Sequence, residues 1–356
     1  MRLLADVSAH GFGHMMQTTC VLDALAARVP DLQVTLRTDV PERAVRRFWT
    51  AGATLLPGPF DPSLAMSAPD TVDVDATAAL YRDFAARFEA AVRESDAVIA
   101  RLRPDAVFAD IAAPGLVAAR RAGIPALALC SLNWADVLRA TLPQGAVDEA
   151  AIRCFDTAYA AADVFLMPEP SMAMPSLGNS RTIGPIGRIG RNRQAEIRAL
   201  IGGSSDKPIG LVSWGGWTTG VAADFLSGLP DEIDWITDPE PLLQAGMTHI
   251  DLMASSAIVI AKPGYGTFVE TVANRARLLH TPREGWPETP ALTAWANRHG
   301  RAAELPPHAS PDEAETLIRR LMAETPPAPP ALTGADEAAD CLLDLVAARD
   351  ARAATA

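Results

Sequence analysis

The sequence has little positive charge and no long apolar run. Its 31 lysines and arginines stand against 43 aspartates and glutamates, which gives a formal net charge of -12 at pH 7. General affinity for nucleic acid depends on basic side chains that displace phosphate counterions, so this balance excludes that class of partner. No segment comes close to the roughly 18 consecutive apolar residues of a membrane-spanning helix, so none is expected.

Cysteine is also scarce. The four thiols, Cys20, Cys130, Cys154 and Cys341, are widely separated and lie in apolar helical or strand patterns. Their spacing, to one another and to the histidines, matches neither a disulfide framework nor a zinc motif. We therefore expect reduced thiols in the core and no bound metal. Because the chain opens on a strand-like segment without a charged leader, we also expect a cytoplasmic protein.

What the sequence has instead is an alternation of short apolar runs with segments of 3.6-residue periodicity. This pattern is typical of β-α units around buried parallel sheets. In the first half, strands are expected at 3–8, 34–37, 54–56, 106–109, 126–129 and 164–167, with helices at 17–28, 76–102 and 149–161. In the second, strands are expected at 209–213, 235–237, 258–260, 277–280 and 302–304, with helices at 267–274 and 289–298. The predicted fold is therefore α/β, with two Rossmann-like, doubly wound domains facing a central cleft.

Domain boundaries follow from composition, because prolines and glycines concentrate between Pro168 and Gly190, as they do in linkers. The predicted parts are an N-terminal domain over 1–168, a linker over 169–190, a C-terminal domain over 191–330, and a last helix with its tail over 331–356. The stretch 60–76 has neither period. It is either a mobile loop near a bound substrate or, in the interpretation we prefer, a surface excursion.

The turn after the first expected strand carries two histidines. It reads Ser8-Ala9-His10-Gly11-Phe12-Gly13-His14. At the carboxyl end of a parallel strand, glycines let a ligand approach the backbone closely, and a histidine can take a proton from a hydroxyl near neutral pH. We prefer His14 as that base. Either histidine can instead be a helix-capping or core residue, and this is the preferred interpretation of His10.

Two further turns, 213–220 and 262–270, follow strands of the second domain. Their small and hydroxyl-bearing residues suit the oxygens of a diphosphate, and include Ser213, Gly215, Gly216, Gly264, Gly266 and Thr267. Lys262 either neutralises phosphate charge or lies on the surface. Glu270 either accepts the two hydroxyls of a ribose or stabilises the dipole of its helix.

In this order the three turns resemble those of the GT-B glycosyltransferases. The likeness extends over residues 2–322. It is greatest to the inverting N-acetylglucosaminyltransferase of peptidoglycan synthesis and to the glycosyltransferase-like domain that precedes some sugar kinases. The segment 10–14 matches the His-Gly-x-Gly-His turn of the latter. Gly266-Thr267 with Glu270 resembles the donor motif Gly-x-Thr-x-x-Glu, with Tyr265 at its first glycine.

The resemblance implies that the first domain serves the acceptor and that the second binds a nucleotide-diphosphate sugar, expected to be linked to UDP. His14 is then the catalytic base, and Asp110 orients it or replaces it. Asp110 can also be a mere helix N-cap. Donor contacts are expected from Gly13, Ser213, Gly215, Gly216, Lys262, Gly264, Gly266, Thr267, Glu270, Glu288 and Thr289.

The implied reaction is the inverting transfer of a hexose or N-acetylhexosamine to an acceptor hydroxyl. The one Asp-x-Asp of the sequence, at 73–75, lies away from the three turns, so we expect transfer without a metal ion or other cofactor. A nucleotide-sugar epimerase or hydrolase on the same fold stays open, as does a non-catalytic protein that binds a nucleotide sugar. The acceptor is unknown, and peripheral contact with a membrane-borne acceptor also stays open.

Overall fold

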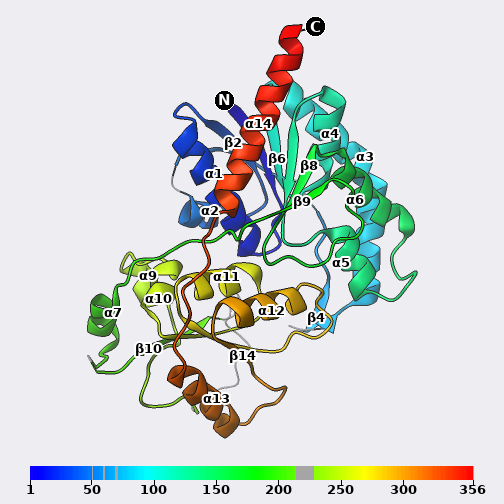
Figure 1. Cartoon of the computed structure of the whole chain (residues 1–356). Helices are drawn as coiled ribbons and strands as arrows, with labels where there is room; N and C mark the ends of the chain where they lie inside the picture. Colours follow the sequence, from blue (N-terminus) through cyan, green and yellow to red (C-terminus); the bar gives the residue numbers. More distant parts are fainter. Residues whose placement is uncertain (50, 59–60, 69–70, 205, 214–227, 356) are drawn as a thin grey trace. The chain divides into compact units, whose positions relative to one another are not determined.

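The computed structural model describes residues 1–49, 51–58, 61–68, 71–204, 206–213 and 228–355. Contacts divide the chain into two compact units. Unit 1 comprises Met1–Ile186, Gly285–Glu288 and Thr333–Ala356, and unit 2 comprises Gly187–Glu284 and Thr289–Leu332. Each unit is built on a parallel sheet of its own (Figure 1).

Unit 1 contains seven parallel strands in the order β3-β2-β1-β6-β7-β8-β9. They are β1 (Arg2–Val7), β2 (Gln33–Arg37), β3 (Thr54–Leu56), β6 (Ala106–Asp110), β7 (Ala126–Leu129), β8 (Val164–Pro168) and β9 (Ser180–Ile183). The central strands β6 and β7 are buried along their whole length, and β1 is exposed only at Arg2. Continuous apolar runs form these strands because helices cover both faces of the sheet.

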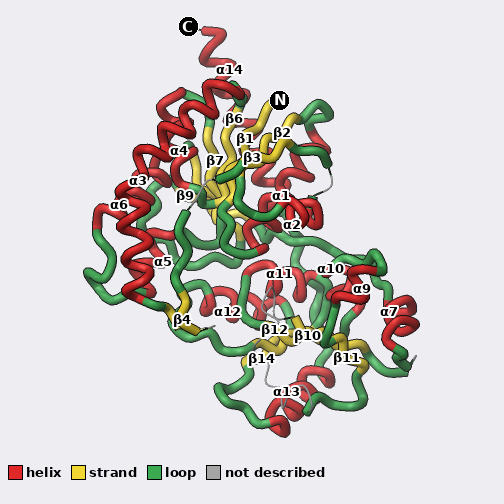
Figure 2. The backbone as a smooth tube through the Cα atoms, turned by 180° about the vertical axis from the view of Figure 1, so that it is seen from behind, coloured by secondary structure: helices red, strands yellow, loops and turns green. Residues whose placement is uncertain are grey.

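The helices of unit 1 form two layers. Their bounds are α1 (Phe12–Arg28), α2 (Glu42–Phe48), α3 (Val74–Leu102), α4 (Ala113–Ala122), α5 (Trp134–Thr141), α6 (Glu149–Ala161) and α14 (Gly334–Thr355). α4 packs against α3 and α6, whereas α1 packs against α14. Figure 2 shows α3, α4 and α6 on one side of the strands and α1 on the other. Crossovers of one hand from β1 to β2 and from β6 to β7 place their helices on opposite faces in this way.

Unit 2 contains five parallel strands in the order β11-β10-β12-β13-β14. They are β10 (Ile209–Ser213), β11 (Asp234–Ile236), β12 (Ile258–Ala261), β13 (Arg277–His280) and β14 (Ala302–Glu304). The helices are α7 (Gln194–Ile201), α9 (Glu240–Gln244), α10 (His249–Ser255), α11 (Tyr265–Ala273), α12 (Thr289–His299) and α13 (Pro311–Ala323). One core cluster joins β12 to α13 through Ile258, Ile260 and Ile318.

The predicted class, two Rossmann-like α/β domains, is confirmed, and each predicted strand appears within two residues of its expected bounds. Other segments differ. Residues 180–183 of the predicted linker form β9, because their backbone pairs with β8. Inside the irregular stretch 60–76, the short strands β4 (Met66–Ala68) and β5 (Thr71–Val72) pair in antiparallel. Among the described helices, none has both the length and the apolar character needed to cross a membrane.

Candidate active site

The strand order of unit 1 changes direction between β1 and β6. β2 follows β1 on one side, and the strands after β6 continue on the other. Open α/β sheets bind their ligands at the carboxyl edge of such a point. Two predicted site residues lie there. Asp110 is the last residue of β6, and His14 lies in the first turn of α1, which begins after Gly11 turns the chain with a φ of 93°.

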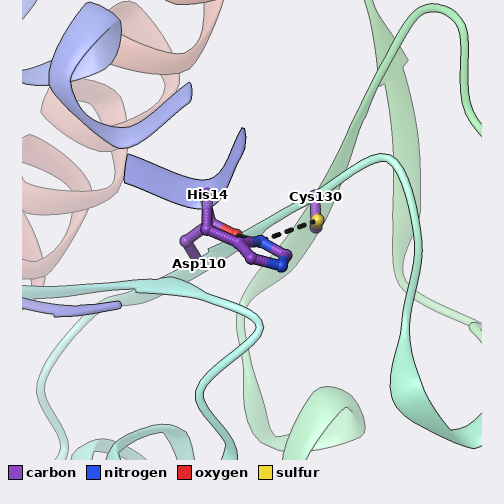
Figure 3. A group of neighbouring side chains, drawn as sticks. All are labelled: His14, Asp110 and Cys130. Atoms are coloured by element: carbon purple, nitrogen blue, oxygen red, sulfur yellow. Dashed lines mark hydrogen bonds and ion pairs between the residues drawn. The ribbon is translucent and has the colours of Figure 1, made fainter. Parts of the chain in front are cut away.

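His14 and Asp110 form a buried pair at this edge. His14 Nδ1 lies 2.8 Å from Asp110 Oδ1, and Thr18 donates to the other carboxylate oxygen at 3.2 Å. The carboxylate accepts the Nδ1 proton, so the ring keeps an unprotonated Nε2. Figure 3 shows Nε2 turned away from Asp110, and no described residue hydrogen-bonds to it. The pair therefore presents one basic nitrogen.

The alternative role of Asp110 as a helix N-cap does not fit. The helix that follows β6 is α4, and its N-cap is Ala112, without a side-chain capping bond from the described residues. Instead, one carboxylate oxygen of Asp110 is hydrogen-bonded to His14 and the other to Thr18. Its geometry is that of a residue that orients the imidazole.

The electrostatic environment makes His14 more basic than a free histidine. Burial lowers the pKa of His14, but the charge and hydrogen bond of Asp110, with the more distant charges of Glu288 and Asp61, outweigh burial and raise it above 6.5. Burial likewise raises the pKa of Asp110, against the opposing influence of His14. The imidazole is thus well suited to take up a proton.

His10 has a different character, although it belongs to the same turn. Burial, together with the charge of His14, lowers its pKa to about 4, so the ring is neutral near pH 7. It packs edge-on against Trp134 with 4.9 Å between ring centroids. These contacts agree with the preferred interpretation of His10 as a packed, structural histidine.

Cys130 lies beside the pair and was not predicted to do so. It follows β7, the neighbour of β6, and its Sγ lies 3.6 Å from His14 Nδ1 (Figure 3). Burial and the charge of Asp110 raise its pKa well above 9, which keeps it a thiol. The sequence correctly predicts a buried, reduced cysteine. Its position next to a histidine depends on the strand order, which spacing does not encode.

Asp61 is a second residue at this edge that the sequence did not predict. The interpretation of 60–76 as a surface excursion is wrong for this residue, which is only 8% exposed. Asp61 accepts hydrogen bonds from Ser8 Oγ at 3.0 Å and from the Ala113 amide at 3.4 Å. Burial raises its pKa to about 7. Its place shortly after an expected strand was the only signal for it.

Glu288 also contributes to this edge of unit 1. Ser131 Oγ donates to its Oε1 at 2.6 Å, and Trp286 Nε1 donates to its Oε2 at 3.4 Å. The predicted boundaries place Glu288 in the C-terminal domain, whereas its contacts assign Gly285–Glu288 to unit 1. Thr289, the next residue, belongs to unit 2 and begins α12. Its buried hydroxyl has no hydrogen-bond partner among the described residues.

Unit 2 has an edge of the same kind, where its strand order changes direction between β10 and β12. Ser213 ends β10, and its hydroxyl lies 3.0 Å from His249 Nε2. The turn after β12 leads into α11, whose N-cap is Gly264 and which has no side-chain cap among the described residues. In its first turn, the amides of Gly266 and Thr267 point along the helix axis and can bind an anion. Gly215 and Gly216 lie outside the described residues.

Glu270 and Lys262 flank this turn. Glu270 is the sixth residue of α11 and only 8% exposed, so it is too far along the helix for a first-turn dipole role. Burial raises its pKa to about 7, against the opposing charge and amide of Arg188. Desolvation and the charge of Arg283 lower the pKa of Lys262.

Comparison with known proteins identifies the fold. No protein-family model matches the chain, and no curated protein sequence matches it. Solved structures match over nearly its whole length. The calicheamicin glycosyltransferase CalG4 is 15% identical with a TM-score of 0.58, covering 99% of this chain and 96% of its own. Arabidopsis thaliana UGT89C1 complexed with UDP is 15% identical with a TM-score of 0.58, covering 98% and 99%. The glycosyltransferase VinC in complex with dTDP is 15% identical with a TM-score of 0.54, covering 98% and 96%.

These matches are too distant in sequence to show more than the architecture. Each of the three spans both units of this chain. The fold is therefore the GT-B fold of glycosyltransferases, with two Rossmann-like domains.

Proposed function

We propose that this protein is an inverting glycosyltransferase that moves a sugar from a nucleotide diphosphate to an acceptor hydroxyl. The observation that carries the proposal is the His14–Asp110 pair, held at the ligand-binding edge of unit 1 with Nε2 directed away from its partner. A buried histidine oriented by a carboxylate is the arrangement that deprotonates hydroxyl groups.

The reaction begins when Nε2 of His14 takes the proton of the acceptor hydroxyl. The oxygen attacks the anomeric carbon, and the bond from that carbon to the diphosphate breaks on the opposite face, with its electron pair leaving on the nucleotide. Configuration at the anomeric carbon therefore inverts. Asp110 stabilises the imidazolium that forms, because its carboxylate already accepts the Nδ1 proton at 2.8 Å.

The diphosphate binds in unit 2 within this proposal. The amides of Gly266 and Thr267 at the start of α11, together with the hydroxyls of Ser213 and Thr267, hold its oxygens. A side chain at Gly264 would meet open space, so a ligand can approach the backbone there. Glu270 accepts the ribose hydroxyls and Lys262 offsets phosphate charge. Glu288 and Thr289 are proposed to contact the sugar.

The donor is proposed to be a UDP-linked hexose or N-acetylhexosamine. The UDP and dTDP complexes among the matched structures support a nucleotide diphosphate as its leaving group. No metal ion is proposed to bridge the diphosphate, since Asp73 of the one Asp-x-Asp caps α3 by accepting from the Ala76 amide at 2.9 Å. We place the enzyme in the cytoplasm, without a further cofactor and without a nucleic-acid partner.

The decisive experiment measures nucleotide-diphosphate release from a panel of nucleotide sugars, with and without a library of hydroxylated acceptors. Release that depends on an acceptor, with a glycosylated product of inverted configuration by NMR, is the expected result. His14→Ala should lower the rate by about 10²- to 10⁴-fold and leave donor affinity nearly intact. His10→Ala is the matched control, from the same turn, and should retain most of the rate.

Other outcomes point to the alternatives. Donor consumption or epimerisation without an acceptor would identify an epimerase or hydrolase. Donor binding by calorimetry with no turnover for any acceptor would favour a non-catalytic binding protein. A His10→Ala variant that loses activity while His14→Ala keeps it would move the base to His10.

A further inference from the structure

His14, Asp110 and Cys130 present three different metal-binding atoms to one another. Nδ1, a carboxylate oxygen and Sγ all lie within 4.8 Å of each other, in the one such group of three found among the described residues. They come from separate elements, namely the first turn of α1, the end of β6 and the residue after β7. The fold rather than a local motif therefore assembles the group (Figure 3).

The distance between the histidine nitrogen and the cysteine sulfur suits a tetrahedral ion. Zinc bonds of about 2.0–2.1 Å to nitrogen and about 2.3 Å to sulfur, at tetrahedral angles, separate the two ligand atoms by about 3.6 Å. Nδ1 and Sγ lie 3.6 Å apart. Nδ1 and the Asp110 oxygen lie 2.8 Å apart, and a zinc ion between them requires about 3.4 Å. A shift of about 0.6 Å, within reach of a side-chain rotation, opens the site.

The charges also balance. A dication with the Cys130 thiolate, the Asp110 carboxylate and a neutral imidazole forms a complex with no net charge, so burying it carries little of the desolvation penalty of an isolated ion. Binding forms a metal–sulfur bond and releases the thiol proton to solvent. A Cys, His and carboxylate set favours zinc-class ions over magnesium or calcium.

We propose that these three residues form a site for a zinc-class divalent ion, and that occupancy of the site switches off His14 as a base. The regulatory half of this inference rests on the proposed function, whereas the binding half does not. A metal bound to Nδ1 takes the place of the proton there. A neutral imidazole then carries its proton on Nε2, which becomes a donor and can no longer accept the acceptor's proton.

Binding is tested first without any activity assay. The metal-free protein is titrated with Co²⁺, followed by the thiolate-to-cobalt charge-transfer absorption, and the cobalt is then displaced with Zn²⁺. One equivalent with the thiolate band is the expected result. Cys130→Ser should lose the band and bind at least about tenfold more weakly, since even residues that only support metal ligands are worth about 10- to 100-fold. Cys154→Ser, the same change at a partly buried position of α6, is the matched control and should behave as wild type.

A second variant keeps the test informative if Cys130→Ser folds poorly. Cys130→Ala is checked by circular dichroism and titrated in the same way. Absence of the band in the folded wild-type protein, or an equal band in a folded Cys130 variant, would overturn the site.

Regulation is tested next, with rates in Zn²⁺ and after EDTA. Wild-type transfer should be inhibited reversibly, and each Cys130 variant should be inhibited at least about tenfold less sensitively relative to its own uninhibited rate. Cobalt binding in a protein with no transferase activity would leave the metal site standing and remove the proposed function. Transfer without cobalt binding would leave the proposed function standing and remove the metal site. Equal zinc sensitivity of wild type and the Cys130 variants would overturn the switch.

Discussion

Nδ1 of His14 lies 2.8 Å from Oδ1 of Asp110, although 96 positions separate the two residues in the sequence. The pair forms because β1 and β6 are neighbours whose carboxyl ends meet at one edge. The charge of Asp110 is the main reason that the pKa of His14 is raised despite burial. A base is active only when unprotonated, so the wild-type rate should fall as pH drops through a value above 6.5.

Asp110→Asn tests this relationship. The amide keeps the size of the side chain but removes its charge, so the pKa of His14 should fall and the acidic limb of the rate should move to lower pH. Turnover at the plateau should drop by about 10²- to 10⁴-fold as the imidazolium loses its stabilising charge. Thr18→Val removes a hydrogen bond to the same carboxylate without its charge, and its limb should stay in place. An unshifted limb in Asp110→Asn would contradict the assignment.

Because Glu270 titrates near neutral pH, we expect donor affinity to depend on pH. The pKa of Glu270 is raised to about 7, and an ionised carboxylate accepts ribose hydroxyls better than a carboxylic acid does. Calorimetry should show that donor binding tightens between pH 6 and 8. The affinity should rise in proportion to the ionised fraction of Glu270. Glu270→Ala should weaken binding at pH 8 by about 1–3 kcal/mol, and Glu270→Gln should make it independent of pH over this range. Unchanged affinity in folded Glu270→Ala would remove the ribose contact.

The sequence predicted the strands because a buried parallel strand is a continuous apolar run. It also predicted His14 and Asp110 as site residues, since both end or follow such strands. Cys130 could not be placed the same way, because its proximity to His14 depends on β7 lying next to β6. Glu288 depends on the packing of a four-residue segment, Gly285–Glu288, against unit 1. Neither relationship leaves a periodic or spacing signal in one sequence.

The start of α1 shows the same limit at short range. Apolar periodicity predicted the helix from residue 17, whereas it begins at Phe12. The glycines and histidines of the turn obscured its first residues, although Gly11 at the N-cap takes a φ that few other residues adopt. His14 therefore lies within the helix and not in a loop before it.

The conservative change Asp61→Asn should make the protein more stable. The pKa of Asp61 is about 7 in the folded protein and about 3.9 when unfolded, so the folded state binds the proton more tightly. Stability from this group is present below pH 4 and is lost as pH rises toward 7. At pH 8 the cost reaches the order of 4 kcal/mol, which Asp61→Asn should relieve in part.

Urea unfolding at two pH values checks this prediction. Asp61→Asn should be more stable than wild type at pH 8 and similar to it near pH 4, because the asparagine amide never ionises. Asp83→Asn, an exposed residue of α3, is the control and should show only a small difference at either pH. A variant that is less stable than wild type at both values would show that the hydrogen bonds with Ser8 and Ala113 outweigh the buried charge.

Substitution of Gly115 should lower the stability of the protein, because α4 passes directly over a buried ion pair. Asp6 on β1 and Arg37 on β2 are 0% and 5% exposed, and Arg37 Nε donates to Asp6 Oδ1 at 2.9 Å. A Cβ at position 115 would lie 2.0 Å from Asp6 Oδ2 and 3.2 Å from Arg37 Nη2. Neither side chain can withdraw, since each would leave the other's charge buried without its partner. Gly115→Ala should therefore lower the free energy of unfolding by about 3–5 kcal/mol, the cost of breaking a buried pair.

Gly178→Ala is the matched control, as its Cβ would meet no atom within 4 Å and its φ is not positive. Thermal unfolding of the two variants decides the matter. Equal midpoints would mean that α4 can move away from β1 at little cost, and the ion pair would then not fix the position of the helix.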